Sequence, residues 1–385
     1  MHRRIPSIVA FVVVPVVTVL LVTAYVLHLR GLELRRELLS QFNGITAPAT
    51  DAIMTDDALM KKYIVTYGPA PTMKVMIQAA EKAHLDCHNR AHQFGRVSYE
   101  EFGDEVLKLN LPECHSGFYH GSIEAYFRKN GTDHLRDKLS FICPDSLNLF
   151  FMHQCRHGLG HGLMAWSSYD LPGTLEFCNM ISDDGGKSSC RTGAYMENIV
   201  GSLTDSDEAR ALGHFTKYLS NDPQYPCTVV KDEYKGDCYF LQTDRMYQLN
   251  RTFQAIADGC AAAPEAYQYT CYPSMGRTIS GLTRGQPEKA LQGCRLIKDH
   301  AHRVECIDAV AKDQLWDPSG AEAGITFCSM VPPEDGQDAC YRGLLYHAAF
   351  VLSPEQRMDF CARIPMPMRD QCLEGSAYPS SSSAS

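Results

Sequence analysis

The stretch Pro287-Glu-Lys-Ala-Leu-Gln-Gly-Cys294, with Cys306 twelve positions later, is one copy of a pattern that recurs along the chain. Seven cysteine pairs are separated by 11 or 12 positions, and their second cysteines recur at steps of 32 to 35 residues with one step of 48. A period of this length is typical of two-helix repeats, and the long step predicts an insertion near 201–225. The seven pairs are Cys143 with Cys155, Cys178 with Cys190, Cys227 with Cys238, Cys260 with Cys271, Cys294 with Cys306, Cys328 with Cys340, and Cys361 with Cys372.

The residues around each pair predict a helix, a short loop and a second helix. Ser353-Pro-Glu-Gln places Ser353 as an N-cap, Pro354 at the first helical position and Gln356 in the capping-box position. Apolar residues keep helical spacing after the second cysteines, whereas strand-like alternation is scarce. The sequence therefore predicts an all-α fold, a solenoid-like array of two-helix repeats of about 35 residues with one disulfide per repeat.

Disulfides explain the paired cysteines better than metal binding does. Zinc sites favour cysteines two to four residues apart, and none of the seven pairs has that spacing. The two remaining cysteines, Cys87 and Cys114, are paired by elimination. The motif for covalent haem attachment, Cys-x-x-Cys-His, does not occur.

Disulfides require an oxidising compartment, and the N-terminus supplies a route to one. Residues 8–27 form an uncharged run of 20 residues, long enough to cross a bilayer. This run predicts a signal-anchor transmembrane helix, with a cleaved signal peptide as the alternative. The body is then extracytoplasmic, whether periplasmic, extracellular or lumenal. A net charge of −9 and a pI near 5.9 argue against a nucleic-acid partner.

These patterns divide the chain into five predicted regions. They are a signal-anchor segment (1–30), a stalk or linker (31–70), His-rich helical repeats (71–200), Cys-paired helical repeats (201–375) and a disordered Ser-rich tail (376–385).

Chemistry is expected where the histidines gather, because nine of the fifteen lie between positions 84 and 161. On helices, His88 and His92, His120 and Glu124, and His157 and His161 are i,i+4 pairs, so each pair shares one helix face. Repeats stack equivalent helices side by side, which predicts that the three pairs converge on one metal site or two adjacent ones. The expected ligands are His88, His92, His120, Glu124, His157 and His161, with His115, His153 and Glu197 as possible additions.

The positions of the histidines relative to the preceding cysteines support this interpretation. His120 and His161 both lie six residues after a cysteine, and later repeats carry Met196, Arg277 or Lys312 there. With the cysteines in disulfides, imidazole and carboxylate remain as ligands, and we favour copper or iron, with zinc possible. The glycines of His157-Gly-Leu-Gly-His161-Gly cost helix stability, so they indicate either close helix packing or room for a flat cofactor such as non-covalent haem.

Cysteine-stapled two-helix repeats of about 35 residues resemble the secreted Sel1-like members of the tetratricopeptide superfamily. The resemblance covers roughly residues 135–375 and concerns architecture. It implies a protein-binding surface on the later repeats and says nothing about the histidines.

Three hypotheses follow for function. The first is an exported, membrane-anchored metalloprotein, with metal-dependent redox chemistry as the leading reaction if it is an enzyme. The second is a non-enzymatic extracellular repeat scaffold that binds a protein partner. The third is a zinc-dependent hydrolase with Glu124 or Glu197 as general base, although His-Glu-x-x-His is absent.

Overall fold

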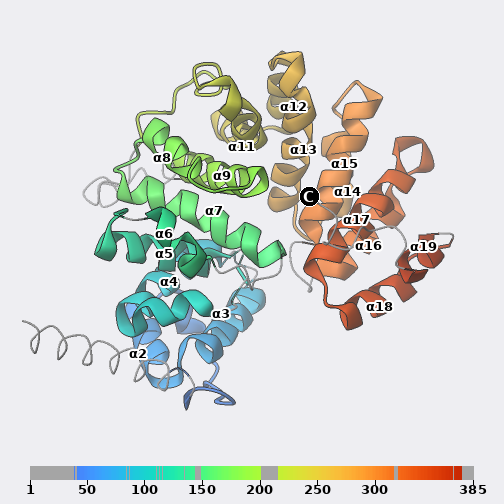
Figure 1. The fold of residues 1–385 in the computed structure, drawn as a ribbon. Coiled ribbons are helices and arrows are strands. Elements are labelled where there is room, and N and C mark those ends of the chain that lie inside the picture. Colours follow the sequence, from blue (N-terminus) through green and yellow to red (C-terminus); the bar gives the residue numbers. More distant parts are fainter. Residues whose placement is uncertain are drawn as a thin grey trace, which may run out of the picture.

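A computed structural model describes residues 39–374, apart from three segments and several single positions. Within the described part the chain forms seventeen α-helices, a few 3-10 turns and no strand, which confirms the all-α prediction (Figure 1). The positions left out are 40, 84, 86, 110, 112, 115, 134, 144–148, 201–215, 316–319 and 367.

The N-terminal helices lead up to and include the three that carry the histidine pairs. Two 3-10 helices, η1 (Asp51–Met54) and η2 (Gly103–Lys108), lie among them. The α-helices are α2 (Asp57–Tyr67), α3 (Pro69–Ala83), α4 (His88–Phe102), α5 (Gly117–Asn130), α6 (Leu135–Ile142) and α7 (Leu149–Trp166).

From α8 onward, shorter helices mostly alternate with longer ones. The shorter set is α8 (Leu171–Cys178), α12 (Phe253–Ala262), α14 (Pro287–Cys294), α16 (Ala321–Met330), α18 (Pro354–Arg363) and the last helix, α19 (Met368–Glu374). The longer set is α9 (Asp184–Val200), α11 (Asp232–Asn250), α13 (Glu265–Leu282), α15 (His300–Gln314) and α17 (Gln337–Val351), with η4 (Pro333–Asp335) before α17.

The longer helices pack side by side in chain order. Contacts run from α4 to α5, α7, α9, α11, α13, α15 and α17 (Figure 1). Helix α17 also contacts α7, so the array curves back on itself. The α17 side chain His347 accordingly lies in the field of His153 from α7 and Lys312 from α15.

All eight predicted disulfides form, and no described cysteine is free. Each bridge spans 5.3 to 5.7 Å between its Cα atoms, within the usual range for disulfides. The bridges are Cys87–Cys114, Cys143–Cys155, Cys178–Cys190, Cys227–Cys238, Cys260–Cys271, Cys294–Cys306, Cys328–Cys340 and Cys361–Cys372.

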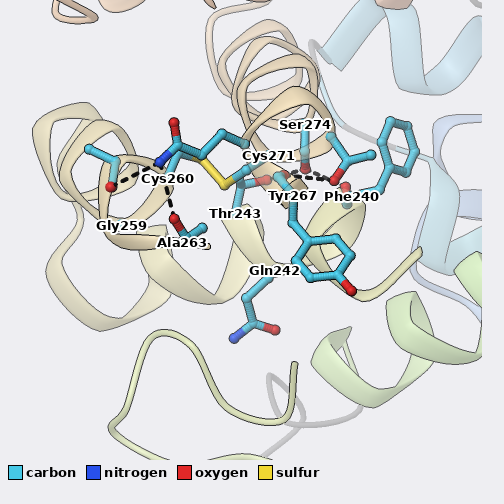
Figure 2. The surroundings of a disulfide bond; sticks show 12 residues. Phe240, Gln242, Thr243, Gly259, Cys260, Ala263, Tyr267, Cys271 and Ser274 are labelled. Atoms are coloured by element: carbon cyan, nitrogen blue, oxygen red, sulfur yellow. Dashed lines mark hydrogen bonds between the residues drawn. A yellow bond between two sulfur atoms is a disulfide. The ribbon is translucent and has the colours of Figure 1, made fainter. Parts of the chain in front are cut away.

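In most repeats the bridge joins the end of a shorter helix to the first half of the longer helix that follows. Figure 2 shows Cys260 of α12 bonded to Cys271 of α13, with Thr243 of α11 and Ser274 of α13 nearby. The hydroxyls of Thr243 and Ser274 hydrogen-bond, which ties this repeat to the preceding long helix.

Two of the later bridges depart from the simple helix, loop and helix prediction. Cys227 lies in a run of turns (216–231) rather than at the end of a helix, and its partner Cys238 lies in α11. The link from α16 to Cys340 of α17 contains the 3-10 helix η4. Cys372, bonded to Cys361, lies in α19, of which the structure describes seven residues.

The predicted capping box at α18 is present. The Ser353 hydroxyl accepts from the backbone N–H of Gln356, the Gln356 side chain accepts from the backbone N–H of Ser353, and Pro354 begins the helix. The reciprocal bonds satisfy two donors that a helix start leaves open.

The prediction of a stalk over 31–70 is wrong for its described part. Ile53, Met60 and Ile64 are fully buried and belong to the same apolar cluster as the interior of α4 and α5. Met60 and Ile64 are one helical turn apart, so α2 presents an apolar edge to the core. This segment is part of the folded body.

The predicted signal-anchor segment (1–30) and the predicted disordered tail (376–385) lie outside the described residues. Among the described helices, none is long and apolar enough to cross a membrane.

Candidate metal centre

Three neighbouring helices bring five imidazoles together. Helix α4 contributes His88 and His92, α5 contributes His120, and α7 contributes His157 and His161, with α5 packed between α4 and α7. Two groups of three are close enough to share an ion. We call His120, His157 and His161 the inner triad, and His88, His92 and His120 the outer triad.

Glycines allow these helices to approach closely. A Cβ on Gly121 of α5 would lie 1.8 Å from the carbonyl oxygen of His92, and one on Gly95 of α4 would lie 2.2 Å from that of Phe118. Real Cβ contacts are not this short, so only glycine fits between α4 and α5.

The glycines of α7 serve the same purpose on both of its sides. A Cβ on Gly160 would lie 2.0 Å from the Cys190 carbonyl oxygen on α9, and one on Gly158 would lie 3.0 Å from Ile123 on α5. Helix packing fills the space beside these glycines. They therefore do not supply the room that the haem alternative needs.

Nitrogen atoms meet at short range inside the cluster. Nε2 of His92 lies 3.1 Å from Nε2 of His88 and 3.1 Å from Nδ1 of His120. Nε2 of His157 lies 3.2 Å from Nε2 of His161. The rings of His120 and His161 stack, with centroids 4.0 Å apart. The nitrogens therefore meet in two groups, His88 with His92 and His120, and His157 with His161, which the stacked rings of His120 and His161 join face to face.

The opposite nitrogens of three rings have fixed partners. Nδ1 of His88 lies 3.0 Å from the Cys114 carbonyl oxygen, Nδ1 of His157 lies 3.2 Å from the Thr192 hydroxyl, and Nδ1 of His161 lies 2.7 Å from Glu197 Oε2. Metal-binding histidines are typically oriented by an outer hydrogen bond of this kind, which leaves the other nitrogen for the ion.

These partners decide which nitrogens carry protons in the inner triad. Because the Thr192 hydroxyl donates to the Ser189 carbonyl, it accepts from His157, so the proton of His157 is on Nδ1. The Glu197 carboxylate likewise places the proton of His161 on Nδ1. When both rings are neutral, their Nε2 atoms present lone pairs to each other at 3.2 Å. A cation between them removes that repulsion.

Burial favours the neutral form of three of these rings, those of His92, His120 and His157. His120, His157 and His161 are 2%, 8% and 3% exposed. Desolvation, and then the charges of neighbouring imidazoles, hold the pKa of His92, His120 and His157 well below its usual value. Neutral imidazole is the form that binds metal ions.

Glu124, a predicted ligand, lies in neither triad of the described residues. Its Oε2 accepts from Arg96 at 2.9 Å and its Oε1 from Arg128 at 2.6 Å, so both oxygens are in ion pairs. It is on the predicted helix, but two arginines hold its carboxylate.

The three possible additions have different positions. Glu197 contacts His161 and accepts from the Tyr169 hydroxyl at 2.7 Å, which makes it an outer partner of a candidate ligand. His153 lies one turn before His157, is exposed, and hydrogen-bonds Ser189 through Nδ1. His115 lies outside the described residues.

Sequence reasoning missed Thr192 and Tyr169. The repeat contains a signal for the first, because each α7 histidine bonds a residue of α9 one period later: 153 to 189, 157 to 192 and 161 to 197. Tyr169 lies in the turn after α7, and no spacing of this kind relates it to the histidines.

Comparison with protein-family models, curated proteins and solved structures finds no match for the chain.

Proposed function

We propose that this protein is an extracytoplasmic metalloprotein whose inner triad holds a transition-metal ion. The observation that carries the proposal is the 3.2 Å approach of His157 Nε2 to His161 Nε2 inside the core, while Thr192 and Glu197 hold the Nδ1 atoms of the two rings. Protonation of His157 would also relieve the repulsion, and burial lowers the pKa of His157 and opposes it.

The spacing of the nitrogens suits coordination. Two nitrogens 3.2 Å apart, each about 2.0–2.1 Å from a shared ion, subtend an angle of roughly 100° at the ion. Tetrahedral and distorted tetrahedral ions accept such an angle. Three protein ligands also leave a coordination position for water or another small ligand.

Copper or iron is the favoured occupant, with zinc next. Imidazole ligands suit all three metals, and among divalent ions copper binds such sites most tightly. Eight disulfides indicate an oxidising environment outside the cytoplasm. We further propose that residues 8–27 anchor the protein in a membrane, and that electron transfer or oxygen chemistry is the reaction class of the bound ion.

The hydrolase alternative is less well supported. It needs a carboxylate free to activate water, whereas the oxygens of Glu124 are held by Arg96 and Arg128, and those of Glu197 by His161 and Tyr169. Neither carboxylate is placed as a general base.

The test is a titration of the full-length protein, produced through an oxidising compartment and purified in mild detergent without a histidine tag. Cu(II) is added to the metal-free protein in competition with a chelator. Wild type should bind tightly, and His157→Ala with His161→Ala should lose at least about 10- to 100-fold in affinity for one ion.

The matched control is His300→Ala with His302→Ala. It removes two histidines of α15 whose nitrogens contact Glu334 and Glu305, away from both triads. Its Cu(II) affinity should equal that of wild type. Equal losses in both double variants, or no binding by wild type, would refute the proposal.

A further inference from the structure

We propose that the cluster holds two metal ions, one in each triad, and that the His120 ring bridges them. This inference rests on the proposed function, since it adds a second ion beside the one in the inner triad. The two triads share His120 and no other residue.

The outer triad also has too few N–H groups to hydrogen-bond all the nitrogens that face one another. The Cys114 carbonyl can only accept, so the proton of His88 is on Nδ1 and its Nε2 presents a lone pair to His92. If the proton of His92 is on Nδ1, a second pair of lone pairs meets at 3.1 Å. If it is on Nε2, that single N–H faces both His88 Nε2 and His120 Nδ1.

If the His92 proton is on Nε2, one nitrogen of His120 is left without a hydrogen-bond partner. Its Nδ1 would then accept from His92, so its own proton would be on Nε2. That atom is buried and has no hydrogen-bond partner among the described residues. A buried polar group without a partner is costly. Neutral imidazoles therefore cannot satisfy all the nitrogens of the outer triad and His120 together.

His120 has the position of a bridge. Its ring centroid lies 5.2 Å from that of His88, 4.9 Å from His92, 5.4 Å from His157 and 4.0 Å from His161. Its Nδ1 faces the outer triad through His92, and its Nε2 is the buried unpartnered atom. Each nitrogen can bind one ion, and the inner ion requires the stacked rings of His120 and His161 to turn until both ring planes contain it.

A bridge through His120 requires the release of one proton. When the second ion binds, the remaining N–H proton of His120 leaves to the solvent, and both ring nitrogens donate to metal. With metal–nitrogen distances of about 2.0–2.1 Å on either side of the ring, the ions would be roughly 6 Å apart. Each ion has two imidazoles of its own and shares the third.

The two sites differ in access. His157 and His161 are buried, whereas His88 and His92 are half-buried. The outer ion should therefore exchange with solvent faster, and the inner ion should be retained longer under a chelator. The outer ion is the one that a small ligand from solvent would meet first.

The test combines metal content with electron paramagnetic resonance of the full-length protein loaded with Cu(II). Wild type should bind two copper ions per chain, and the integrated signal of the fully loaded protein should be clearly smaller than its copper content because an imidazolate couples the two spins. His88→Ala with His92→Ala should bind one copper ion that gives its full signal.

His120→Ala supplies a second reading of the bridge. If this variant folds, any copper that it retains should be uncoupled. If it does not fold, the His88→Ala, His92→Ala variant still decides the matter, since these two residues are half-buried and are not members of the inner triad.

The outcomes separate the two proposals. One copper ion in wild type, lost in the His157→Ala, His161→Ala variant, would overturn the second ion and leave the proposed function standing. Two ions with the full signal of independent spins would overturn the bridge. No copper at all would overturn both.

Discussion

His161 is held by a chain of two hydrogen bonds that begins outside the histidine cluster. The Tyr169 hydroxyl donates to Glu197 Oε1 at 2.7 Å, and Glu197 Oε2 accepts from His161 Nδ1 at 2.7 Å. Ser168 and Tyr169 both have left-handed backbone angles, with φ of 55° and 62°. Non-glycine residues rarely adopt this conformation, so the surrounding structure holds this turn in place.

Removing these hydrogen bonds should weaken the proposed metal site, and the two variants below should differ in the size of the effect. Glu197→Gln removes the carboxylate that orients His161, so Cu(II) affinity should fall about 10- to 100-fold. Tyr169→Phe leaves Glu197 in place without one donor and should have a smaller effect in the same direction. Chelator competition measures both affinities, and the copper resonance spectrum should shift in both variants.

Tyr195→Phe is the matched control. Tyr195 is 1% exposed on α9, and its hydroxyl has no hydrogen-bond partner among the described residues. Its removal should leave the copper affinity and spectrum unchanged. An equal effect of Tyr169→Phe and Tyr195→Phe would mean that packing, not the hydrogen-bond chain, is responsible.

His347 makes stability depend on pH. Burial, and then the charges of Lys312 and His153, lowers its pKa to about 4. The unfolded chain takes up a proton near pH 6.5 that the folded protein refuses until about pH 4, so this group destabilises the fold as pH falls through that window. Its share should reach roughly 2–3 kcal/mol by pH 4.

The measurement is the free energy of unfolding of wild type and His347→Gln at pH 7 and at pH 4.5, with disulfides intact. Glutamine does not titrate, so the free energy of unfolding of the variant should rise relative to that of wild type as the pH is lowered. A difference in stability that is the same at both pH values would contradict the assignment.

At the scale of elements, glycines set the distance between the helices that carry the histidines. An alanine at Gly121 would place its Cβ against the backbone of His92, which no side-chain rotation can relieve. Gly121→Ala should therefore destabilise the protein by about 1–3 kcal/mol and weaken metal binding in the outer triad, since α4 must move away from α5.

Gly236→Ala is the control for this substitution. Gly236 lies inside α11, and a Cβ there would meet nothing within 4 Å. Alanine should raise stability by about 0.5–1 kcal/mol, because it favours the helix and no neighbour is disturbed. Thermal unfolding and copper affinity of both variants test the pair of predictions. A tolerated Gly121→Ala would refute the close packing of α4 on α5.

The helix faces that carry the site could be predicted from the spacing of the histidines. Helical spacing placed His88 and His92, and His157 and His161, on common faces, and the structure brings their nitrogens to 3.1 and 3.2 Å. Glu124 follows the same spacing after His120 but pairs with Arg96 and Arg128 instead. Spacing fixes a helix face, whereas the partner on that face depends on neighbouring helices.

At the scale of the whole molecule, the cysteine rhythm predicts the succession of helices but not its curvature. Each disulfide of the repeats is local and joins segments adjacent in sequence. The contact of α17 with α7 depends on small rotations summed over every repeat, which no single repeat encodes. The packing of residues 41–70 into the body was likewise missed, since that segment has no cysteine to place it.

Repeats should tolerate the loss of a disulfide independently of one another. Replacing both cysteines of Cys294–Cys306 by alanine should cost about 3 kcal/mol and leave copper affinity unchanged. Replacing Cys143 and Cys155 should cost a similar amount and also weaken copper binding, because Cys155 is two residues before His157 on α7.

Thermal unfolding and chelator competition measure the two effects. If removal of the Cys294–Cys306 bridge abolished copper binding as completely as removal of Cys143–Cys155, the repeats would be coupled throughout the array, and the assignment of the site to α4, α5 and α7 would lose its support.

Elemental analysis of the purified protein shows whether the histidine cluster binds a metal ion. The full-length protein is to be produced through an oxidising compartment, purified without a histidine tag and measured for copper, iron and zinc per chain. We expect a near-stoichiometric transition metal, with copper or iron ahead of zinc. A well-folded protein that contains no metal and takes up none on titration would contradict it, and would favour the protein-binding scaffold instead.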